Sequence, residues 1–185
     1  MDDSAIIELF FDRSEQAIRA LDDKYGRVCY SLSYNILHSR QDAEECVNDA
    51  YLGVWNAIPP ARPNPLLAFL CRIVRNLSLM RYHADMAAKR GGGSYSVALE
   101  ELEGCLASSH TVEGDIEEHE LVQLIEDFLE TMSPKNRILF LRRYWFSDSY
   151  EEIAVRTGLS KKNVSVRLTR IRKQLRYYLE ERGVV

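Results

Sequence analysis

A basic stretch in the C-terminal third of the chain carries side chains that can bind nucleic acid. It reads SYEEIAVRTGLSKKNVSVRLTRIRKQL (residues 149–175). Lys and Arg neutralise phosphates, while Asn, Ser, Thr and Arg can reach base edges in the major groove of DNA. A positive face could also meet a membrane surface or only water, so the elements that present it must decide. Its polar residues are Lys161, Lys162, Asn163, Ser165, Arg167, Thr169, Arg170, Arg172 and Lys173.

The spacing within this stretch predicts two helices joined by a tight turn. Ser149 and Glu152 have the spacing of a capping box at the start of the first helix. Gly158 stands where that helix must end, in a conformation with positive φ that glycine adopts at low cost, and Ser160 can cap the second helix. The second helix has one apolar face, formed by Val164, Leu168, Ile171 and Leu175. The pattern favours a DNA-binding helix-turn-helix, and the alternative is a helical hairpin with a solvated basic face.

The charge distribution supports the nucleic-acid interpretation better than the total charge does. The net charge of −4 and the pI of about 5.6 argue weakly against nucleic-acid binding. Residues 91–130, however, hold 11 acidic and no basic side chains, whereas residues 131–185 hold 13 basic and 5 acidic ones, a net charge of +8. A local basic region of this kind is typical of a nucleic-acid-binding domain.

Composition narrows the class of protein further. With 185 residues, 46% of them apolar and 28% charged, the chain can form one ordinary domain or two small ones. Its apolar runs are too short for a transmembrane helix, and MDDSAIIELF is acidic where a signal peptide would be basic. We therefore expect a cytoplasmic protein without membrane insertion.

No residue pattern indicates catalysis, a cofactor or a metal. The four cysteines are Cys29, Cys46, Cys71 and Cys105, and they include no Cys-x-x-Cys pair. Three of them lie at apolar positions of helical patterns, and we predict that they are reduced core thiols. The four histidines show no ligand spacing, and the chain has no glycine-rich phosphate loop or nucleophile motif. We expect a protein that is not an enzyme.

Helical periodicity dominates the rest of the chain and predicts an all-α fold. AEECVNDAYLGVW (43–55) keeps its apolar residues on one helical face, and Asp42 is predicted to cap that helix. Similar patterns lie upstream, from Leu21 to Ile36, and downstream in PLLAFLCRIVRNLSLMRYH (65–83), after the proline-rich loop IPPARPNP (58–65). Helicity resumes near residue 120, with a Ser133-Pro134 helix start.

Glycines and acidic residues divide these helices into two small domains. RGGGSYS (90–96) ends the first group, and an acidic, weakly periodic stretch follows it. We predict a domain over residues 1–90, an acidic flexible linker over 91–118 and a helix-turn-helix domain over 119–185.

Three motifs in order resemble the sigma-70 family of bacterial RNA polymerase factors. DAEECVNDAYLGVW resembles the polymerase-binding helix of region 2, and FLCRIVRNLSLMRY the promoter-melting helix that follows it. MSPKNRILFLRRYWFSDSYEEIAVRTGLSKKNVSVRLTRIRKQLRYYL resembles region 4. Two such domains with none between them are the layout of the extracytoplasmic-function (ECF) subgroup. The resemblance implies a factor that binds core RNA polymerase, recognises −35 and −10 promoter elements and promotes DNA opening.

The resemblance also assigns roles to residues. It implies binding of the polymerase clamp helices by an acidic face in which Leu52 is exposed: Asp42, Glu45, Asn48, Asp49, Leu52 and Asn56. Recognition of the −10 element is implied for Arg72, Arg75, Asn76, Met80 and Arg81, although the family often has Asp where this chain has Met80. Unpaired bases need planar side chains or pockets, with cations along the backbone.

Recognition of the −35 element is implied for Arg143, Lys161, Lys162, Asn163, Ser165, Val166, Arg167, Thr169, Arg170 and Lys173. The family usually begins this helix with small apolar residues, and the two lysines here should steepen the salt dependence of DNA binding. The polymerase flap and an anti-sigma factor are further implied partners.

The acidic linker allows three interpretations. It could be a solvated spacer, it could lie in the positively charged RNA path of the polymerase, or it could fold over the basic domain and suppress DNA binding by the free protein. Two other functions remain open: a stand-alone transcription regulator, which would not bind core polymerase, and a helical scaffold without a DNA role.

Overall fold

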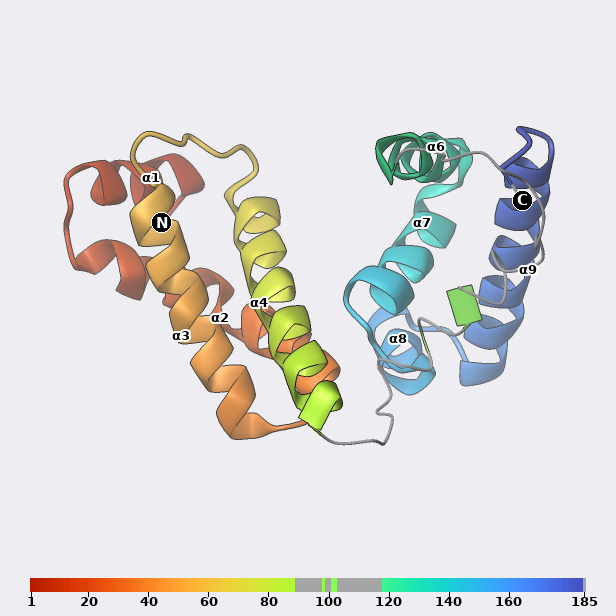
Figure 1. The fold of residues 1–185 in the computed structure, drawn as a ribbon, viewed down its shortest axis with the longest axis horizontal. Coiled ribbons are helices and arrows are strands. Elements are labelled where there is room, and N and C mark those ends of the chain that lie inside the picture. The colour runs from red at the N-terminus through yellow and green to blue at the C-terminus, as the bar shows by residue number, and fades with distance from the viewer. Residues whose placement is uncertain (89–97, 99–100, 103–117, 185) are drawn as a thin grey trace. The chain divides into compact units, whose positions relative to one another are not determined.

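The chain folds into two compact units, Met1–Tyr95 and Ser96–Val185. The computed structural model describes residues 1–88, 98, 101–102 and 118–184. Within these ranges the secondary structure is helical and contains no strand (Figure 1). The all-α prediction with two helical domains is confirmed. The predicted glycine-rich joint at 90–96 lies outside the described residues, and the predicted limits at 90 and 118 stay predictions.

The N-terminal unit is a bundle in which α2, α3 and α4 pack against one another and α1 packs against α2. Its helices are α1 (Asp3–Phe11), α2 (Gln16–Leu37), α3 (Arg40–Ala57) and α4 (Leu66–Ala88). The core is apolar, with Phe10, Leu21, Ile36, Val54, Leu70 and Val74 fully buried. Helix α1 was not predicted, because its nine residues are too few for periodicity to stand out. Asp2 caps it by accepting a hydrogen bond from the Ala5 amide at 2.8 Å.

Helix α3 begins at Arg40, so the prediction that Asp42 caps it was wrong. Ser39 has the extended backbone of an N-cap, and its hydroxyl accepts a hydrogen bond from the Asp42 amide at 3.3 Å. Asp42 lies in the first turn, where a carboxylate still interacts favourably with the helix dipole. The helix ends at Ala57, before the proline-rich loop, as predicted. Arg62 of that loop forms an exposed ion pair with Glu8 of α1 at 2.6 Å.

Three cysteines confirm the prediction of reduced core thiols. Cys29, Cys46 and Cys71 form no disulfide and are buried, and burial raises the pKa of the Cys46 thiol. Cys105 lies outside the described residues. Among the described residues, no group of His, Cys, Asp and Glu side chains is arranged to hold a metal ion, and no helix is long and apolar enough to cross a membrane.

The C-terminal unit packs its helices around a second apolar core. They are α6 (Glu118–Thr131), α7 (Pro134–Phe140), the π-helical turn η1 (Leu141–Trp145), α8 (Tyr150–Thr157) and α9 (Lys161–Glu180). Ser133 and Pro134 start α7 as predicted, although the Ser133 side chain makes no capping bond. The wide turn η1 was not predicted. In it the Phe146 amide donates to the Leu141 carbonyl, five residues back, at 3.0 Å.

Candidate nucleic-acid interface

Helices α8 and α9 form the predicted helix-turn-helix. The Ser149 hydroxyl accepts from the Glu152 amide at 3.2 Å, and the Glu152 carboxylate accepts from the Ser149 amide at 2.7 Å, which completes the capping box. Gly158 ends α8 with φ of 69°. Ser160 caps α9 by accepting from the Asn163 amide at 3.2 Å. All three local predictions are confirmed, so the turn is encoded by its own residues.

Helix α9 buries one face and exposes the other, as its periodicity predicts. Its apolar residues Val164, Leu168, Ile171 and Leu175 pack in one cluster with Ile153 of α8. The residues of the predicted DNA-binding face that are exposed on α9 are Lys161, Lys162, Asn163, Val166, Thr169, Arg170 and Lys173. Ser165 and Arg167 are half-buried, and Lys161 is ion-paired with Glu151. A mostly exposed, cationic face of this kind suits the major groove.

Arg143 is the exception among the residues predicted for the −35 face, because it is buried, with 6% of its surface exposed. Its guanidinium binds the Glu101 carboxylate in bidentate fashion, Nε to Oε2 at 3.2 Å and Nη2 to Oε1 at 3.1 Å. Its Nη1 donates to the Asp148 carbonyl at 3.1 Å. The predicted contact of Arg143 with phosphate stays a prediction. In this structure the guanidinium donates its hydrogen bonds to the Glu101 carboxylate instead.

Glu101 is surrounded by further donors that the sequence did not reveal. Arg172 donates from Nη1 to Oε2 at 3.1 Å, and the Tyr150 hydroxyl lies 3.0 Å from Oε1. The Tyr144 hydroxyl accepts from Arg172 at 2.9 Å. Burial raises the pKa of Tyr144 to about 12, so this phenol stays protonated at neutral pH. We call the four residues Arg143, Tyr144, Tyr150 and Arg172 the Glu101 socket.

A weak sequence signal does point to this arrangement. Ala98, Glu101 and Leu102 have the i, i+3, i+4 spacing of one helical face. In the structure Ala98 is 3% exposed, and Leu102 packs against the C-terminal core. An acidic residue that shares a helical face with two apolar residues is the sequence pattern that could have indicated a buried partner for Glu101.

The residues predicted for the −10 element lie along α4. Arg72, Asn76 and Met80 are exposed at intervals of four residues, and Arg75 is half-buried. Met80 is 69% exposed, unusual for a large apolar side chain. Arg81 instead pairs with α3, through Asp42 at 2.6 Å and Glu45 at 2.9 Å. The structure thus joins one predicted DNA-binding residue to two predicted polymerase-binding residues.

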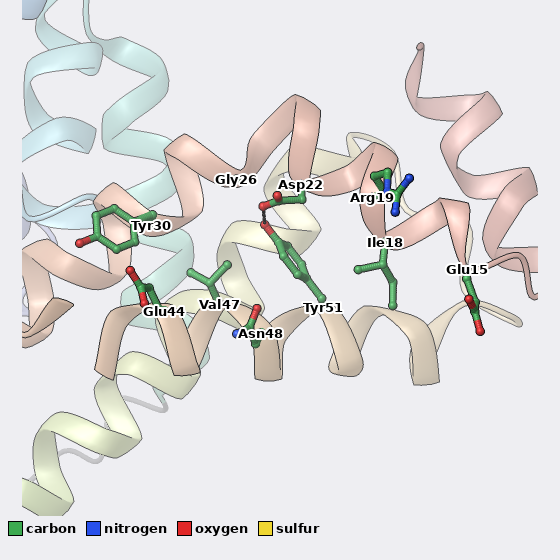
Figure 2. A pocket seen from close by; sticks show the side chains of 10 residues that line it. All are labelled: Glu15, Ile18, Arg19, Asp22, Gly26, Tyr30, Glu44, Val47, Asn48 and Tyr51. Carbon is green, nitrogen blue, oxygen red and sulfur yellow. Dashed lines mark hydrogen bonds between the residues drawn. The ribbon is translucent and has the colours of Figure 1, made fainter. Parts of the chain in front are cut away.

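The predicted polymerase-binding face lies on α3. Glu45, Asn48, Asp49, Leu52 and Asn56 are exposed, Leu52 by 57%, and Asp42 is half-buried. Next to it, an open groove of about 840 Å³ runs between α2 and α3 (Figure 2). Val47 and Ile18 contribute apolar surface to the groove, and Glu15, Asp22, Glu44 and Asn48 line it with acidic and polar groups.

A hydrogen bond links the two packed helices inside this groove. Tyr51 of α3 points to α2 and donates to the Asp22 carboxylate at 2.6 Å (Figure 2). Burial raises the pKa of Tyr51, so it remains a donor. Gly26 faces this pair, and a Cβ there would overlap the Asp22 carboxylate and lie 3.3 Å from the Tyr51 hydroxyl. No sequence pattern indicates this role of Gly26.

Comparisons with known proteins match each unit separately. The model of "Sigma-70 region 2" matches residues 21–85, and the model of "Sigma-70, region 4" matches residues 123–175. The ECF RNA polymerase sigma factor SigE of Mycolicibacterium smegmatis is 27% identical over 165 residues, which is 89% of this chain and 61% of that protein. The chain thus spans about three-fifths of the length of this curated relative.

A solved structure, that of CnrH in complex with the cytosolic domain of CnrY, shows a looser likeness. It covers 97% of both chains at 18% identity with a TM-score of 0.44.

Proposed function

We propose that this chain, which belongs to the sigma-70 family, is an ECF sigma factor that recruits core RNA polymerase to promoters. One observation carries the proposal: regions 2 and 4 match in order, one in each unit, and the second unit folds as a helix-turn-helix. The factor does no covalent chemistry. It selects promoter DNA and promotes its opening in the cytoplasm.

The C-terminal unit reads the −35 element. The exposed residues from Lys161 to Lys173 present cations for phosphates, together with Asn163 and Thr169 as donors and acceptors for base edges. Val166, 41% exposed, offers an apolar contact of the kind that recognises a thymine methyl group. This unit also meets the polymerase flap, as in the family.

The N-terminal unit binds the polymerase and the melted −10 element. Its α3 face combines exposed carboxylates with the apolar Leu52, which suits a partner helix that carries basic and apolar residues. The groove between α2 and α3 extends this surface. On α4, Arg72 and Asn76 can hold the DNA backbone while Met80 packs against an unstacked base.

An anti-sigma factor is a further proposed partner, inferred from the family. Co-purification of the tagged chain from its own cells, followed by inhibition of transcription with the captured protein, tests this. A captured protein that leaves transcription unchanged would argue against the role.

The test of the main proposal is run-off transcription with purified core polymerase over a library of random promoter DNA. We expect transcripts that require this chain and share spaced −35 and −10 elements. Absence of transcripts and of a complex with core polymerase, together with salt-sensitive DNA binding, would instead identify a stand-alone regulator. Absence of any DNA binding would leave a helical scaffold.

A further inference from the structure

We propose that the Glu101 socket is a binding site for a backbone phosphate of promoter DNA, and that Glu101 occupies it in the free protein as an internal competitor. This regulation of the C-terminal unit rests on the proposed function, because it concerns the same DNA-binding surface.

The chemistry of the socket is that of an anion site. Two guanidinium groups and two phenols surround one carboxylate: Arg143 binds both oxygens, Arg172 and Tyr144 bind Oε2, and Tyr150 binds Oε1. Arginine forks bind carboxylate and phosphate with the same bidentate geometry. The socket is also built into the fold, since the side chain of Arg143 is only 8% exposed and its Nη1 is held by the Asp148 carbonyl.

The position of the socket connects it to the reading face of α9. Arg172 donates from Nη2 to the Thr169 hydroxyl at 3.2 Å, and Thr169 is an exposed residue of the predicted −35 face. Tyr150 is the first residue of α8, directly after the capping residue Ser149. Because the first helix of a helix-turn-helix crosses the DNA backbone while the second lies in the groove, a phosphate is the expected ligand here.

Glu101 differs from the rest of the socket in where it comes from. It lies 42 residues before Arg143 and 71 before Arg172, outside the helix-turn-helix. Its described neighbours on the same helical face are Ala98, which is 3% exposed, and Leu102, which is half-buried and packs against the C-terminal core. A contact with so little apolar surface can be displaced without unfolding the core, because stability against local opening follows buried apolar area.

Competition follows from charge. While the Glu101 carboxylate is bound in the socket, it neutralises Arg143 and Arg172 and would repel an approaching phosphate. DNA must therefore displace Glu101, or a partner must move it, before the two arginines can contribute to affinity. This refines the interpretation of the acidic linker as a suppressor of DNA binding to a single carboxylate.

The test measures binding of the full-length chain to a 30-base-pair duplex of random sequence, without polymerase, over a range of salt concentrations. Glu101→Gln removes the competing charge and keeps the size of the side chain. The matched control is Glu180→Gln, which makes the same charge change at an exposed ion pair with Arg176 on α9. We expect Glu101→Gln to bind about tenfold tighter than wild type, the effect of one charge-assisted contact, and the control to change affinity less than about twofold.

A second variant distinguishes the socket from a general charge effect. Arg172→Gln should weaken binding little in the wild-type background, where the site is occupied, and should abolish most of the gain in the Glu101→Gln background. The slope of log affinity against log salt concentration should become steeper in Glu101→Gln, by the amount expected for about one additional phosphate contact. In the double variant the slope should return to the wild-type value. Equal affinities for Glu101→Gln and Glu180→Gln would overturn the proposal.

Hydrogen exchange provides a readout that does not depend on a variant. Saturating duplex DNA should reduce the protection of the amides of Ala98, Glu101 and Leu102 in the wild-type chain. DNA binding with unchanged protection there would also overturn the proposal. Neither experiment involves polymerase, so the two proposals can fail separately. If run-off transcription fails but Glu101→Gln binds duplex DNA more tightly, only the sigma role is rejected. If transcription succeeds but Glu101→Gln and Glu180→Gln bind DNA equally, only the competition by Glu101 is rejected.

Discussion

Both units hold arginines of the proposed DNA surfaces in ion pairs, but the two pairings differ in burial. In the N-terminal unit, the side chains of Arg81, Asp42 and Glu45 are 36%, 26% and 53% exposed. In the C-terminal unit, those of Arg143, Arg172 and Glu101 are 8%, 19% and 21% exposed. Exposed pairs contribute little stability, whereas breaking a buried pair leaves a charge without compensation. The first pairing can therefore exchange freely with solvent or DNA, and the second needs a competing anion.

The pairings also differ in the origin of their carboxylates. Asp42 and Glu45 belong to the proposed polymerase-binding face of the same unit, while Glu101 lies outside the helix-turn-helix. We expect the N-terminal cation to respond to what binds α3 and the C-terminal cations to respond to the position of Glu101.

The largest expected effect is the loss of stability in one unit, with the other unit unchanged, when a core residue is truncated. Leu168→Ala empties a fully buried site of the C-terminal core and should lower the free energy of unfolding of that unit by about 3 kcal/mol. Each unit holds one of the two tryptophans, Trp55 and Trp145. In a Trp55→Phe background, urea unfolding followed by Trp145 fluorescence should show the loss.

The same Leu168→Ala change in a Trp145→Phe background should leave the Trp55 transition in place. Val155→Ala is the control, because Val155 is 84% exposed. Equal shifts of both tryptophan signals would mean that the two cores do not unfold separately.

The comparison of ion pairs is sharpened by removing one arginine from each unit. Arg143→Gln should cost about 2 kcal/mol, because it removes a buried bidentate pair and the bond to the Asp148 carbonyl, while Arg172 still compensates Glu101. Arg81→Gln should leave stability nearly unchanged and reduce promoter opening, measured by permanganate reactivity of the −10 region. A stability loss for Arg81→Gln as large as that for Arg143→Gln would remove the difference between the units.

A pair of glycine substitutions tests the packing beneath the groove of the N-terminal unit. Gly26→Ala should destabilise by about 1 kcal/mol, since loss of the partly buried Tyr51–Asp22 hydrogen bond outweighs the gain in helix propensity. Gly53→Ala meets only Ile73 Cγ2 at 3.3 Å and should be neutral or stabilising by up to about 1 kcal/mol. Urea unfolding read from Trp55 decides, and equal effects at the two glycines would contradict the clash at Gly26.

The smallest effect concerns pH and the buried Asp148. Burial raises the pKa of this carboxyl, against the opposing effect of Arg142 and Arg156. Asp148 therefore holds its proton more tightly in the folded state than in the unfolded state. The contribution of Asp148 to stability falls as pH rises from the ordinary carboxyl pKa through the raised pKa. Asp148→Asn should flatten this part of the stability profile of the C-terminal unit, measured by Trp145 fluorescence. An unchanged slope would assign the pH dependence to other groups.

Local signals explain what the sequence could predict. Ser149, Glu152, Gly158 and Ser160 each act on backbone within a few residues, so the helix-turn-helix follows from the sequence alone. The cap of α3 was predicted wrongly, because Ser39 and Asp42 are both residue types that cap helices, and the extended backbone of Ser39 makes it the N-cap.

Long-range contacts explain what the sequence could not predict. Arg143 looks like a surface cation in the sequence, and its main partner in the fold is a carboxylate 42 positions earlier. The role of Gly26 likewise depends on Tyr51 of another helix. In each case the information lies in tertiary packing, which overrides local propensity.

The π-helical turn Leu141–Trp145 has a consequence for the direction in which the reading helix points. An α-helix rotates by about 100° per residue, and a π-turn takes in one residue more than an α-turn. Every element after Trp145 is therefore rotated relative to the continuation of α7. Deleting one residue from this turn would restore the α-helical phase and swing α8 and α9 around the axis of α7, with every base-reading side chain unchanged. On the proposed function, the number of residues in this five-residue turn is thus as much a part of promoter specificity as the identity of the side chains proposed to enter the groove.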